Sequence, residues 1–234
     1  MILVGIDDTD TSDSRGTNQL AKHLARVLSP SYRCLRIVRH QLLVDDRVPY
    51  TSKNGSASIW LEPMTSPDID RLTETIRTEM LCEFIPGSDP GLCVMEDVPA
   101  SVTEFGHRCQ REVVGAVDAQ KLAIEERVVL EGLGGTCDGV IGALAAVGLA
   151  ATGDDGRVVH WERMQDELSG VHPVEEVMRR NVLVRSQADH QEITTGTIDV
   201  GKKLRPNLRG GRQVVFVTRD PHVTEPRWLA NKLT

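Results

Sequence analysis

Aromatic side chains make up only 3% of the 234 residues. Hydrophobic residues still account for 40% of the chain, so we expect a buried core built mainly from Leu, Val, Ile and Ala. No apolar run approaches the roughly 18 residues that span a bilayer, because glycine or charge interrupts each one. The N-terminus has no basic segment before Asp7, which excludes a signal peptide. These absences predict a soluble cytoplasmic protein with no membrane partner.

An excess of positive charge is absent as well. Lys and Arg number 27 against 34 Asp and Glu, for a formal net charge of −7. Because phosphate neutralisation needs a basic surface, this balance argues against general nucleic-acid binding. The five cysteines form no Cys-x-x-Cys pair, and the seven histidines have no ligand spacing. We therefore expect reduced thiols, with neither a disulfide framework nor a zinc site.

Apolar periodicity predicts strands that alternate with helices, which is typical of an α/β or α+β fold. A seam near residues 100–115 gives two predicted domains, 1–110 and 111–234. The predicted strands are Ile2–Ile6, Leu35–Val44, Ala57–Leu61, Val158–Trp161, Val182–Arg185, Thr197–Val200 and Gln213–Thr218. The predicted helices are Thr17–Leu28, Pro67–Leu81, Ala116–Leu130 and Gly139–Ala151.

Three carboxylates follow the first predicted strand, in Gly5-Ile6-Asp7-Asp8-Thr9-Asp10. They repel one another unless a cation lies between them, and Mg²⁺ prefers such oxygen ligands. The carboxyl end of a strand is also where α/β folds place ligands. If strand geometry continues, Asp8 and Asp10 share a side and Asp7 faces away. The sequence predicts Asp7, Asp8 and Asp10 as metal ligands; the alternative is an acidic turn whose side chains bind backbone N–H groups.

Arg15-Gly16-Thr17 begins the first predicted helix. The free N–H groups at a helix start favour phosphate, and the Thr17 hydroxyl is a candidate phosphoryl acceptor or metal ligand. A purely structural role is the alternative, because Thr is a common N-cap residue. Leu20 leaves that position without a capping box.

A glycine-rich segment, Gly132-Leu133-Gly134-Gly135-Thr136-Cys137-Asp138-Gly139, precedes a predicted helix of small residues. Glycines let backbone approach a phosphate, and the following helix offers its dipole. The pattern matches neither a P-loop nor a dinucleotide fingerprint. Two interpretations stay open, a phosphate cradle at Gly134–Thr136 and close packing of the helix.

Two basic segments could face anions. Lys53-Asn54-Gly55 is first of all a hairpin signal, and its functional interpretation is a lysine that pairs with phosphate. The stretch from residue 202 to residue 212 holds five basic residues and no acidic one. It is either an anion-facing loop or a solvated surface loop.

Five short motifs follow one another along the chain in a fixed order. They are Gly-Ile-Asp-Asp-Thr-Asp, the Gly16–Ala21 helix start, Val-Pro-Tyr with a downstream Asn-Gly, Asp89-Pro90-Gly91, and the run Gly139–Gly148. In this order the chain resembles the N-terminal half of the archaeal tRNA-Ile2 2-agmatinylcytidine synthetases, in pieces from residue 1 to about Asp220.

This resemblance implies an ATP- and Mg²⁺-dependent phosphotransferase or ligase, with a kinase-like α/β domain (1–110) followed by a ferredoxin-like α+β domain (111–234). Enzymes of that family cleave ATP to AMP and pyrophosphate and phosphorylate a cytidine carbonyl, and an amine then attacks the phosphorylated cytidine. It also phosphorylates a threonine at the start of its first helix, and Thr-x-x-Leu-Ala places Thr17 there. The expected catalytic residues are Asp8, Asp10 and Thr17, and the expected nucleotide-binding residues are Lys53, Asn54, Gly134, Gly135 and Thr136.

The sequence also departs from that family. From its length of 234 residues we expect the OB-fold and the zinc ribbon to be absent, and no Cys-x-x-Cys pair replaces the zinc ribbon. Tyr50 is the only aromatic residue near the expected site. The acceptor is then either a small molecule or a cytidine in tRNA, reached through a separate tRNA-binding subunit. Two other hypotheses are a Mg²⁺-dependent phosphohydrolase with a strand-end aspartate as nucleophile and a non-catalytic nucleotide-binding subunit.

Overall fold

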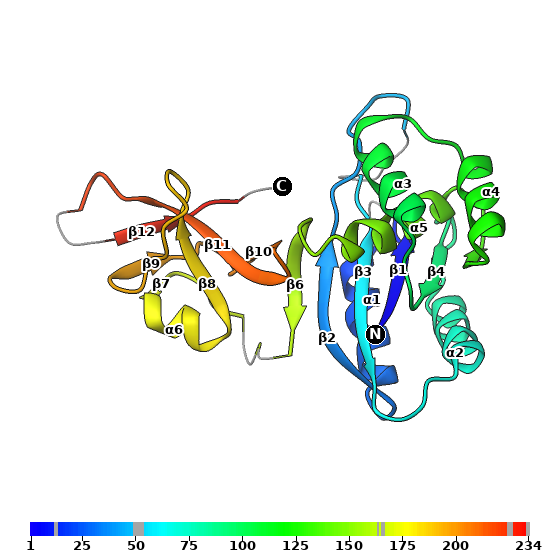
Figure 1. Ribbon diagram of the computed structural model, residues 1–234, viewed down its shortest axis with the longest axis horizontal. Coiled ribbons are helices and arrows are strands. Elements are labelled where there is room, and N and C mark those ends of the chain that lie inside the picture. Colours follow the sequence, from blue (N-terminus) through cyan, green and yellow to red (C-terminus); the bar gives the residue numbers. More distant parts are fainter. Residues whose placement is uncertain (12–13, 49–53, 163, 165–166, 224–226, 233–234) are drawn as a thin grey trace. The chain divides into compact units, whose positions relative to one another are not determined.

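The computed structural model describes residues 1–11, 14–48, 54–162, 164, 167–223 and 227–232. The chain divides into two compact units, Met1–Thr152 and Gly153–Thr234 (Figure 1). The boundary expected from the sequence, between residues 110 and 111, lies inside the first unit. The glycine-rich loop and the small-residue helix therefore belong to the N-terminal unit, together with the acidic strand end. Lys53 and Tyr50 lie outside the described residues.

The sheet of the first unit has the strand order β5-β4-β1-β3-β2. Its strands are β1 (Ile2–Asp7), β2 (Tyr32–Arg39), β3 (Ala57–Pro63), β4 (Gly91–Met95) and β5 (Val129–Gly132). All four pairings are antiparallel, so the unit is α+β and the parallel-sheet rule for ligand position does not apply to it. The chain as a whole mixes helices with sheet, as the α+β prediction requires.

Strand β1 occupies the middle of this sheet, and its residues from Ile2 to Ile6 are buried on both faces. Burial on both faces requires helices on both sides of the strand. Helix α1 (Thr17–Leu28) packs on β1, β2 and β3, and α2 (Ile69–Cys82) packs on α1 and β4. Helices α3 (Ala100–Arg111), α4 (Ala116–Glu126) and α5 (Gly139–Ala151) pack on one another, with α5 against β1, β3, β4 and β5 (Figure 1).

Helix α5 lies so close to the sheet that glycine is required on both sides of the contact. A Cβ atom at Gly5 of β1 would overlap the carbonyl oxygen of Ala143, and one at Gly91 of β4 would overlap that of Gly139. On its other side, a Cβ at Gly148 would overlap the carbonyl of Val102 in α3. Close packing thus accounts for the small residues of this helix.

One predicted helix is shorter than expected. The pattern predicts a helix from Ala116 to Leu130, whereas α4 ends at Glu126 and Arg127 takes a left-handed conformation with φ 56°. The residues after it form β5, which pairs with β4 from Val129 to Gly132. The partner strand lies some way back along the chain, so local periodicity could not reveal the pairing. Helix α3 and strand β4 were not predicted.

The second unit contains the strands β6 (Arg157–Trp161), β7 (Val171–Pro173), β8 (Val182–Ser186), β9 (Thr197–Asp199), β10 (Asn207–Arg209), β11 (Arg212–Arg219) and β12 (Arg227–Ala230), and helix α6 (Val174–Arg179). Its strand order is β6-β10-β11-β12-β9-β7, and β8 pairs with β11 in parallel. Leu183, Val214 and Phe216 form a buried cluster between these strands.

The basic stretch of residues 202–212 is partly neutralised within this unit. Lys203 and Arg205 both form ion pairs with Glu167, and these hydrogen bonds lower the pKa of that carboxyl to about 2. Arg209 donates to the carbonyl of Asp154. Among the described residues, no helix is long and apolar enough to cross a membrane.

Candidate functional site

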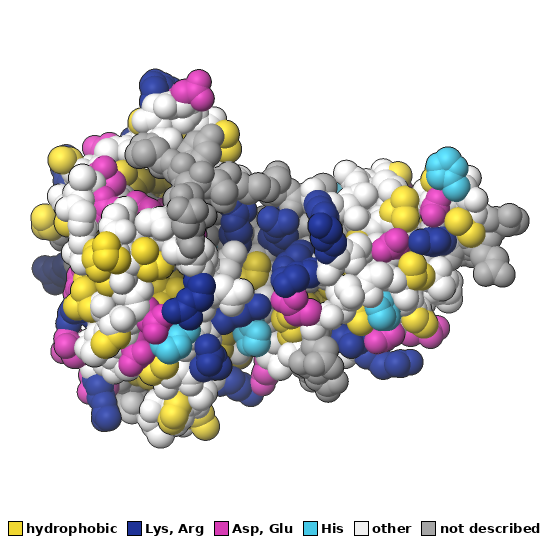
Figure 2. Space-filling model, turned by 180° about the vertical axis from the view of Figure 1, so that it is seen from behind, with side chains coloured by type: hydrophobic (Ala, Val, Ile, Leu, Met, Phe, Trp, Pro, Cys, Tyr) yellow, Lys and Arg dark blue, Asp and Glu magenta, His cyan; other side chains and the backbone are white. Residues whose placement is uncertain are grey.

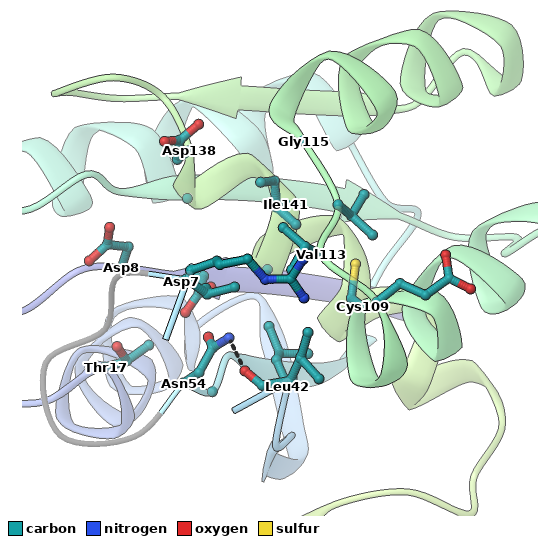
Figure 3. A pocket seen from close by; sticks show the side chains of 18 of the residues that line it. Asp7, Asp8, Thr17, Leu42, Asn54, Cys109, Val113, Gly115, Asp138 and Ile141 are labelled. Atoms are coloured by element: carbon teal, nitrogen blue, oxygen red, sulfur yellow. Dashed lines mark hydrogen bonds between the residues drawn. The ribbon is translucent and has the colours of Figure 1, made fainter. Parts of the chain in front are cut away.

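A pocket of about 280 Å³ opens at the C-terminal end of β1 and lies wholly within the first unit (Figure 3). One part of its wall is acidic and comes from the end of β1 and the residues before α5: Asp7, Asp8, Asp10 and Asp138; two further charged residues, Arg47 and Glu112, also line the pocket. The other part is mainly aliphatic, with Leu42, Leu43, Val48, Val113, Val114 and Ile141. The pocket therefore offers a charged end and an apolar end.

All three predicted aspartates line this pocket. The strand ends at Asp7, and Asp8 takes the left-handed φ of 47°, a conformation that Asp tolerates better than most residues. Strand alternation therefore stops before Asp10. The expectation that Asp7 faces away from Asp8 and Asp10 required the strand to continue, and this requirement is not met.

Carboxylate crowding and burial shape the protonation of these residues. Burial raises the pKa of Asp7 to about 7, helped by the charges of Asp8 and Asp10 and opposed by the Asp8 N–H and by Arg39. Burial raises the pKa of Asp8 to about 6, with further contributions from Asp89, Asp10 and Asp138. Burial also raises the pKa of Asp10, against hydrogen bonds from Thr17. These carboxylates carry charge that the described residues do not fully compensate.

Thr17 is the first residue of α1, after an N-cap at Gly16 that makes no side-chain bond. It is buried, and its hydroxyl accepts a hydrogen bond from Thr9 Oγ1 at 3.2 Å. The Thr17 N–H and hydroxyl both bond to the Asp10 carboxylate. Thr17 is therefore not the N-cap residue; it lines the pocket with its hydroxyl held beside Asp10.

The glycine-rich loop takes a different position from the three aspartates. Gly134, Gly135 and Thr136 are outside the pocket lining, while Asp138 and Gly139 belong to it. The N–H groups of Thr136, Cys137 and Asp138 donate to the carboxylate of Asp89, at 3.0, 2.7 and 3.1 Å. An internal anion thus binds the N–H group of Thr136, one of the three residues that the sequence suggested for phosphate, and those of the two residues that follow it.

The apolar end of the pocket is held by hydrogen bonds between distant segments. Leu43 N–H donates to the carbonyl of Cys109 at the end of α3, at 2.9 Å. Asn54, a predicted nucleotide-binding residue, lines the pocket but its Nδ2 donates to the carbonyl of Leu43 at 2.7 Å (Figure 3). Burial raises the pKa of the Cys109 thiol to about 12, so this thiol stays protonated at neutral pH.

A preformed metal cage is absent from the part of the chain that the structure describes. There, no three His, Cys, Asp or Glu side chains come together closely enough to hold an ion. Mg²⁺ in phosphoryl-transfer sites is commonly bound by one or two carboxylates together with substrate phosphates and water. The uncompensated carboxylates of Asp8 and Asp10 fit this second arrangement and not the first. Asp7 fits it less well, because Gly142 of α5 covers its carboxylate and burial, which raises its pKa to about 7, disfavours the charged form.

Sequence reasoning missed several residues of this region. Asp138 lines the pocket, and Asp89 holds the loop that presents it, but neither was assigned a role. Both lie far along the chain from the aspartates of β1, so spacing carries no signal for them. The aliphatic wall was missed for the same reason, since Leu42, Cys109 and Ile141 come from three separate segments.

The fold has counterparts among solved structures. A tRNA fluorescent labelling enzyme matches with a TM-score of 0.56 and 22% identity over 63% of this chain and 35% of that one. Apo TiaS, a tRNA-Ile2 agmatidine synthetase, matches with a TM-score of 0.55 and 21% identity over 63% and 35%. The complex of TiaS with tRNA-Ile2 and ATP matches with 0.55 and 22% over 63% and 36%. These likenesses establish the fold.

The resemblance to agmatidine-forming synthetases is thereby confirmed at the level of structure. The chain matches only about a third of the length of those proteins. No protein-family model matches the chain, and no curated protein sequence does.

Proposed function

We propose that this protein is an ATP- and Mg²⁺-dependent phosphotransferase or ligase whose reaction takes place in the pocket at the end of β1. The acceptor is a cytidine in tRNA, presented by a separate tRNA-binding subunit, or a small molecule. One observation carries the proposal. The carboxylates of Asp8 and Asp10, whose charge is not fully compensated, lie in the same pocket as the Thr17 hydroxyl, which is hydrogen-bonded to Asp10. The fold shared with TiaS, which is known in complex with tRNA-Ile2 and ATP, supports it.

In this proposal Asp8 and Asp10 hold Mg²⁺ together with the phosphates of ATP. The ion supplies neutralisation of the charge that develops on the transferring phosphoryl group. The Thr17 hydroxyl donates a hydrogen bond to the carboxylate of Asp10. In this proposal Asp10 takes up the hydroxyl proton when Thr17 accepts a phosphoryl group. The acidic end of the pocket repels phosphates unless the cation binds with them, so nucleotide binding depends on Mg²⁺.

Lys53 remains a proposed phosphate ligand from the sequence alone, since it lies outside the described residues. The aliphatic end of the pocket, with Leu42, Val113 and Ile141, suits the flat apolar face of a nucleobase better than a charged group. Asn54 borders both ends. The Gly134–Thr136 loop contributes by shaping the wall before α5, because Asp89 accepts hydrogen bonds from the N–H and hydroxyl groups of Thr136.

Titration calorimetry of the purified chain with ATP, with and without Mg²⁺, tests this proposal. We expect binding in the micromolar range with Mg²⁺ and none detectable without it. In Asp8→Asn the Mg²⁺-dependent binding disappears while the melting temperature is kept. Asp70→Asn is the matched control, since Asp70 lies on α2 and does not line the pocket. Equal binding by wild type and Asp8→Asn contradicts the proposal, and binding without any turnover favours a nucleotide-binding subunit.

A phosphohydrolase is the second candidate, favoured by the Asp-x-Asp spacing of Asp8 and Asp10 at a strand end in one pocket. There the Asp8 carboxylate attacks the phosphorus of a phosphate ester and the bond from phosphorus to the alcohol oxygen breaks, so that the alcohol leaves with a proton taken from water and an aspartyl-phosphate forms. Water then hydrolyses the aspartyl-phosphate to inorganic phosphate and restores Asp8. Trapping a phosphoryl group on Asp8 in a panel of phosphate esters supports this candidate. An inert panel together with Mg²⁺-dependent ATP binding rejects it.

A further inference from the structure

Asp89 occupies an unusual place beside the pocket without lining it. Its carboxylate accepts hydrogen bonds from three consecutive N–H groups, those of Thr136, Cys137 and Asp138, at 3.0, 2.7 and 3.1 Å, and from the Thr136 hydroxyl at 2.5 Å. Consecutive backbone N–H groups that converge in this way form an anion-binding nest. Here the anion belongs to the protein itself.

The loop needs this anion to keep its shape. Gly135 and Cys137 both have left-handed φ values, +59° and +66°, and for Cys137 that conformation is unfavourable without compensation. The three N–H groups also point toward one place, so their dipoles repel one another unless a negative charge lies there. The Asp89 carboxylate supplies that charge and so fixes the backbone of Asp138, whose side chain lines the pocket.

The other end of Asp89 reaches the acidic strand end. Its N–H donates to the carbonyl of Asp8 at 3.0 Å, and Asp8 is the residue with the left-handed φ of 47°. The following residues are clamped too, because a Cβ at Gly139 would overlap the carbonyl of Asp89. One residue therefore holds the backbones of two pocket aspartates, Asp8 and Asp138.

We infer that Asp89 is a positioning residue for the proposed reaction, which sets the separation of Asp8 and Asp138 through its carboxylate–loop and N–H–carbonyl bonds. This inference rests on the proposed function for its catalytic meaning. Its structural part stands alone, since the hydrogen bonds exist whatever ligand the pocket takes. Asp89 does not touch the pocket contents, so its effect passes through the residues that it holds.

Hydrogen exchange of the peptide covering residues 134–139 tests the structural part in the full-length chain. In Asp89→Ala the amides of Thr136, Cys137 and Asp138 lose their acceptor, and we expect them to exchange roughly tenfold faster. Formate, a small carboxylate, restores the protection in Asp89→Ala by filling the nest, whereas chloride at equal ionic strength does not. Asp89→Asn, which keeps the size of the side chain, gives a smaller increase and no formate effect.

Calorimetry with Mg²⁺-ATP tests the catalytic part. We expect Asp89→Ala to weaken Mg²⁺-dependent binding by about 10- to 100-fold, as loss of a ligand-orienting group does in metal sites, and formate to recover it. Asp68→Ala is the control, because Asp68 accepts the N–H of Arg71 at the start of α2 and is absent from the pocket lining. It lowers the melting temperature with no change in Mg²⁺ dependence and no response to formate.

The outcomes separate the two proposals. Unchanged exchange at the three amides in Asp89→Ala overturns the inference, and so does unchanged affinity in a variant whose wild type binds Mg²⁺-ATP. If the wild type itself does not bind Mg²⁺-ATP, the proposed function fails, and the exchange experiment with formate still decides whether Asp89 positions the loop. If Asp89→Ala does not fold, Asp89→Asn decides by the same two measurements.

Discussion

The carboxylate of Asp7 packs against Gly142 of α5, where a Cβ atom would overlap it. Burial raises its pKa to about 7, and the neighbouring charges of Asp8 and Asp10 raise it further, while Arg39 opposes them. The folded protein therefore binds a proton at Asp7 that the unfolded chain releases near its ordinary value of 3.8. Asp7 thereby links folding stability to pH, in the same direction as Asp8 and Asp10, whose pKa values are also raised.

The sign of the linkage follows from the proton count. Between about pH 4 and pH 7 the folded state binds more protons than the unfolded state, so stability falls as the pH rises through this range. We expect the free energy of unfolding to be higher at pH 5 than at pH 8. Asp7→Asn removes the half-buried charge and raises stability at pH 8 by on the order of 2 kcal/mol, less than the whole shift in pKa corresponds to, because solvent screens part of the effect.

Urea denaturation of wild type and Asp7→Asn at pH 5 and pH 8 measures this difference. Asp70→Asn, on the exposed surface of α2, is the control and leaves the pH dependence of the wild type unchanged. A wild type that becomes more stable between pH 5 and pH 8 contradicts the raised pKa of Asp7.

At the scale of elements, helix α5 determines how the N-terminal unit packs. Its glycines and alanines let its backbone contact the backbones of β1, β4 and α3. The run Gly139–Gly148 supports two interpretations from sequence, a phosphate loop with its helix or a close contact. In the structure α5 is in close contact with its neighbours from Gly139 to Gly148, and only its first residues line the pocket.

This packing makes a prediction far from the pocket. In Gly148→Ala the added Cβ overlaps the carbonyl of Val102, so we expect destabilisation by about 1–3 kcal/mol, although Ala favours a helix by about 1 kcal/mol relative to Gly. The melting transition of the purified variant measures it. Gly115→Ala is the control, because a Cβ there meets nothing within 4 Å, and its stability changes by less than about 1 kcal/mol. Equal stability of the two variants contradicts the close contact.

At the scale of the whole molecule, charge is divided unevenly between the units. The residues of Met1–Thr152 include 22 Asp and Glu against 14 Lys and Arg, whereas Gly153–Thr234 includes 12 against 13. Most of the net charge of −7 therefore belongs to the unit that holds the pocket. Figure 2 shows Lys and Arg side chains interspersed with Asp and Glu on the face that it draws. An acidic unit binds a polyanion poorly by itself.

This charge distribution predicts how the chain handles RNA. We expect the purified chain to bind tRNA only in the non-specific range, with a Kd of about 10⁻⁴ to 10⁻⁶ M near physiological salt, and to lose affinity as salt rises. Fluorescence anisotropy with a labelled tRNA over a salt series measures this. Unlabelled DNA of similar length is the control and competes equally well. Tight binding that salt does not weaken contradicts the need for a separate tRNA-binding subunit.

Local patterns in the sequence determined much of this protein. Helix α1 begins and ends at the predicted residues, and β1, β3, α5 and β11 were predicted within one or two residues at each end, because their periodicity and breakers are local. Three of the four aspartates that line the pocket, Asp7, Asp8 and Asp10, were singled out from the sequence for the same reason, since they lie within four residues of the chain.

Only the tertiary structure decided which distant residues share the site. Asp89, Asp138 and Leu42 meet the end of β1 through strand pairing and helix packing, and no spacing in the sequence encodes those contacts. The structure also assigned the N–H groups of the glycine-rich loop to Asp89. Local chemistry sets which groups can bind an anion, and the fold sets which anion reaches them.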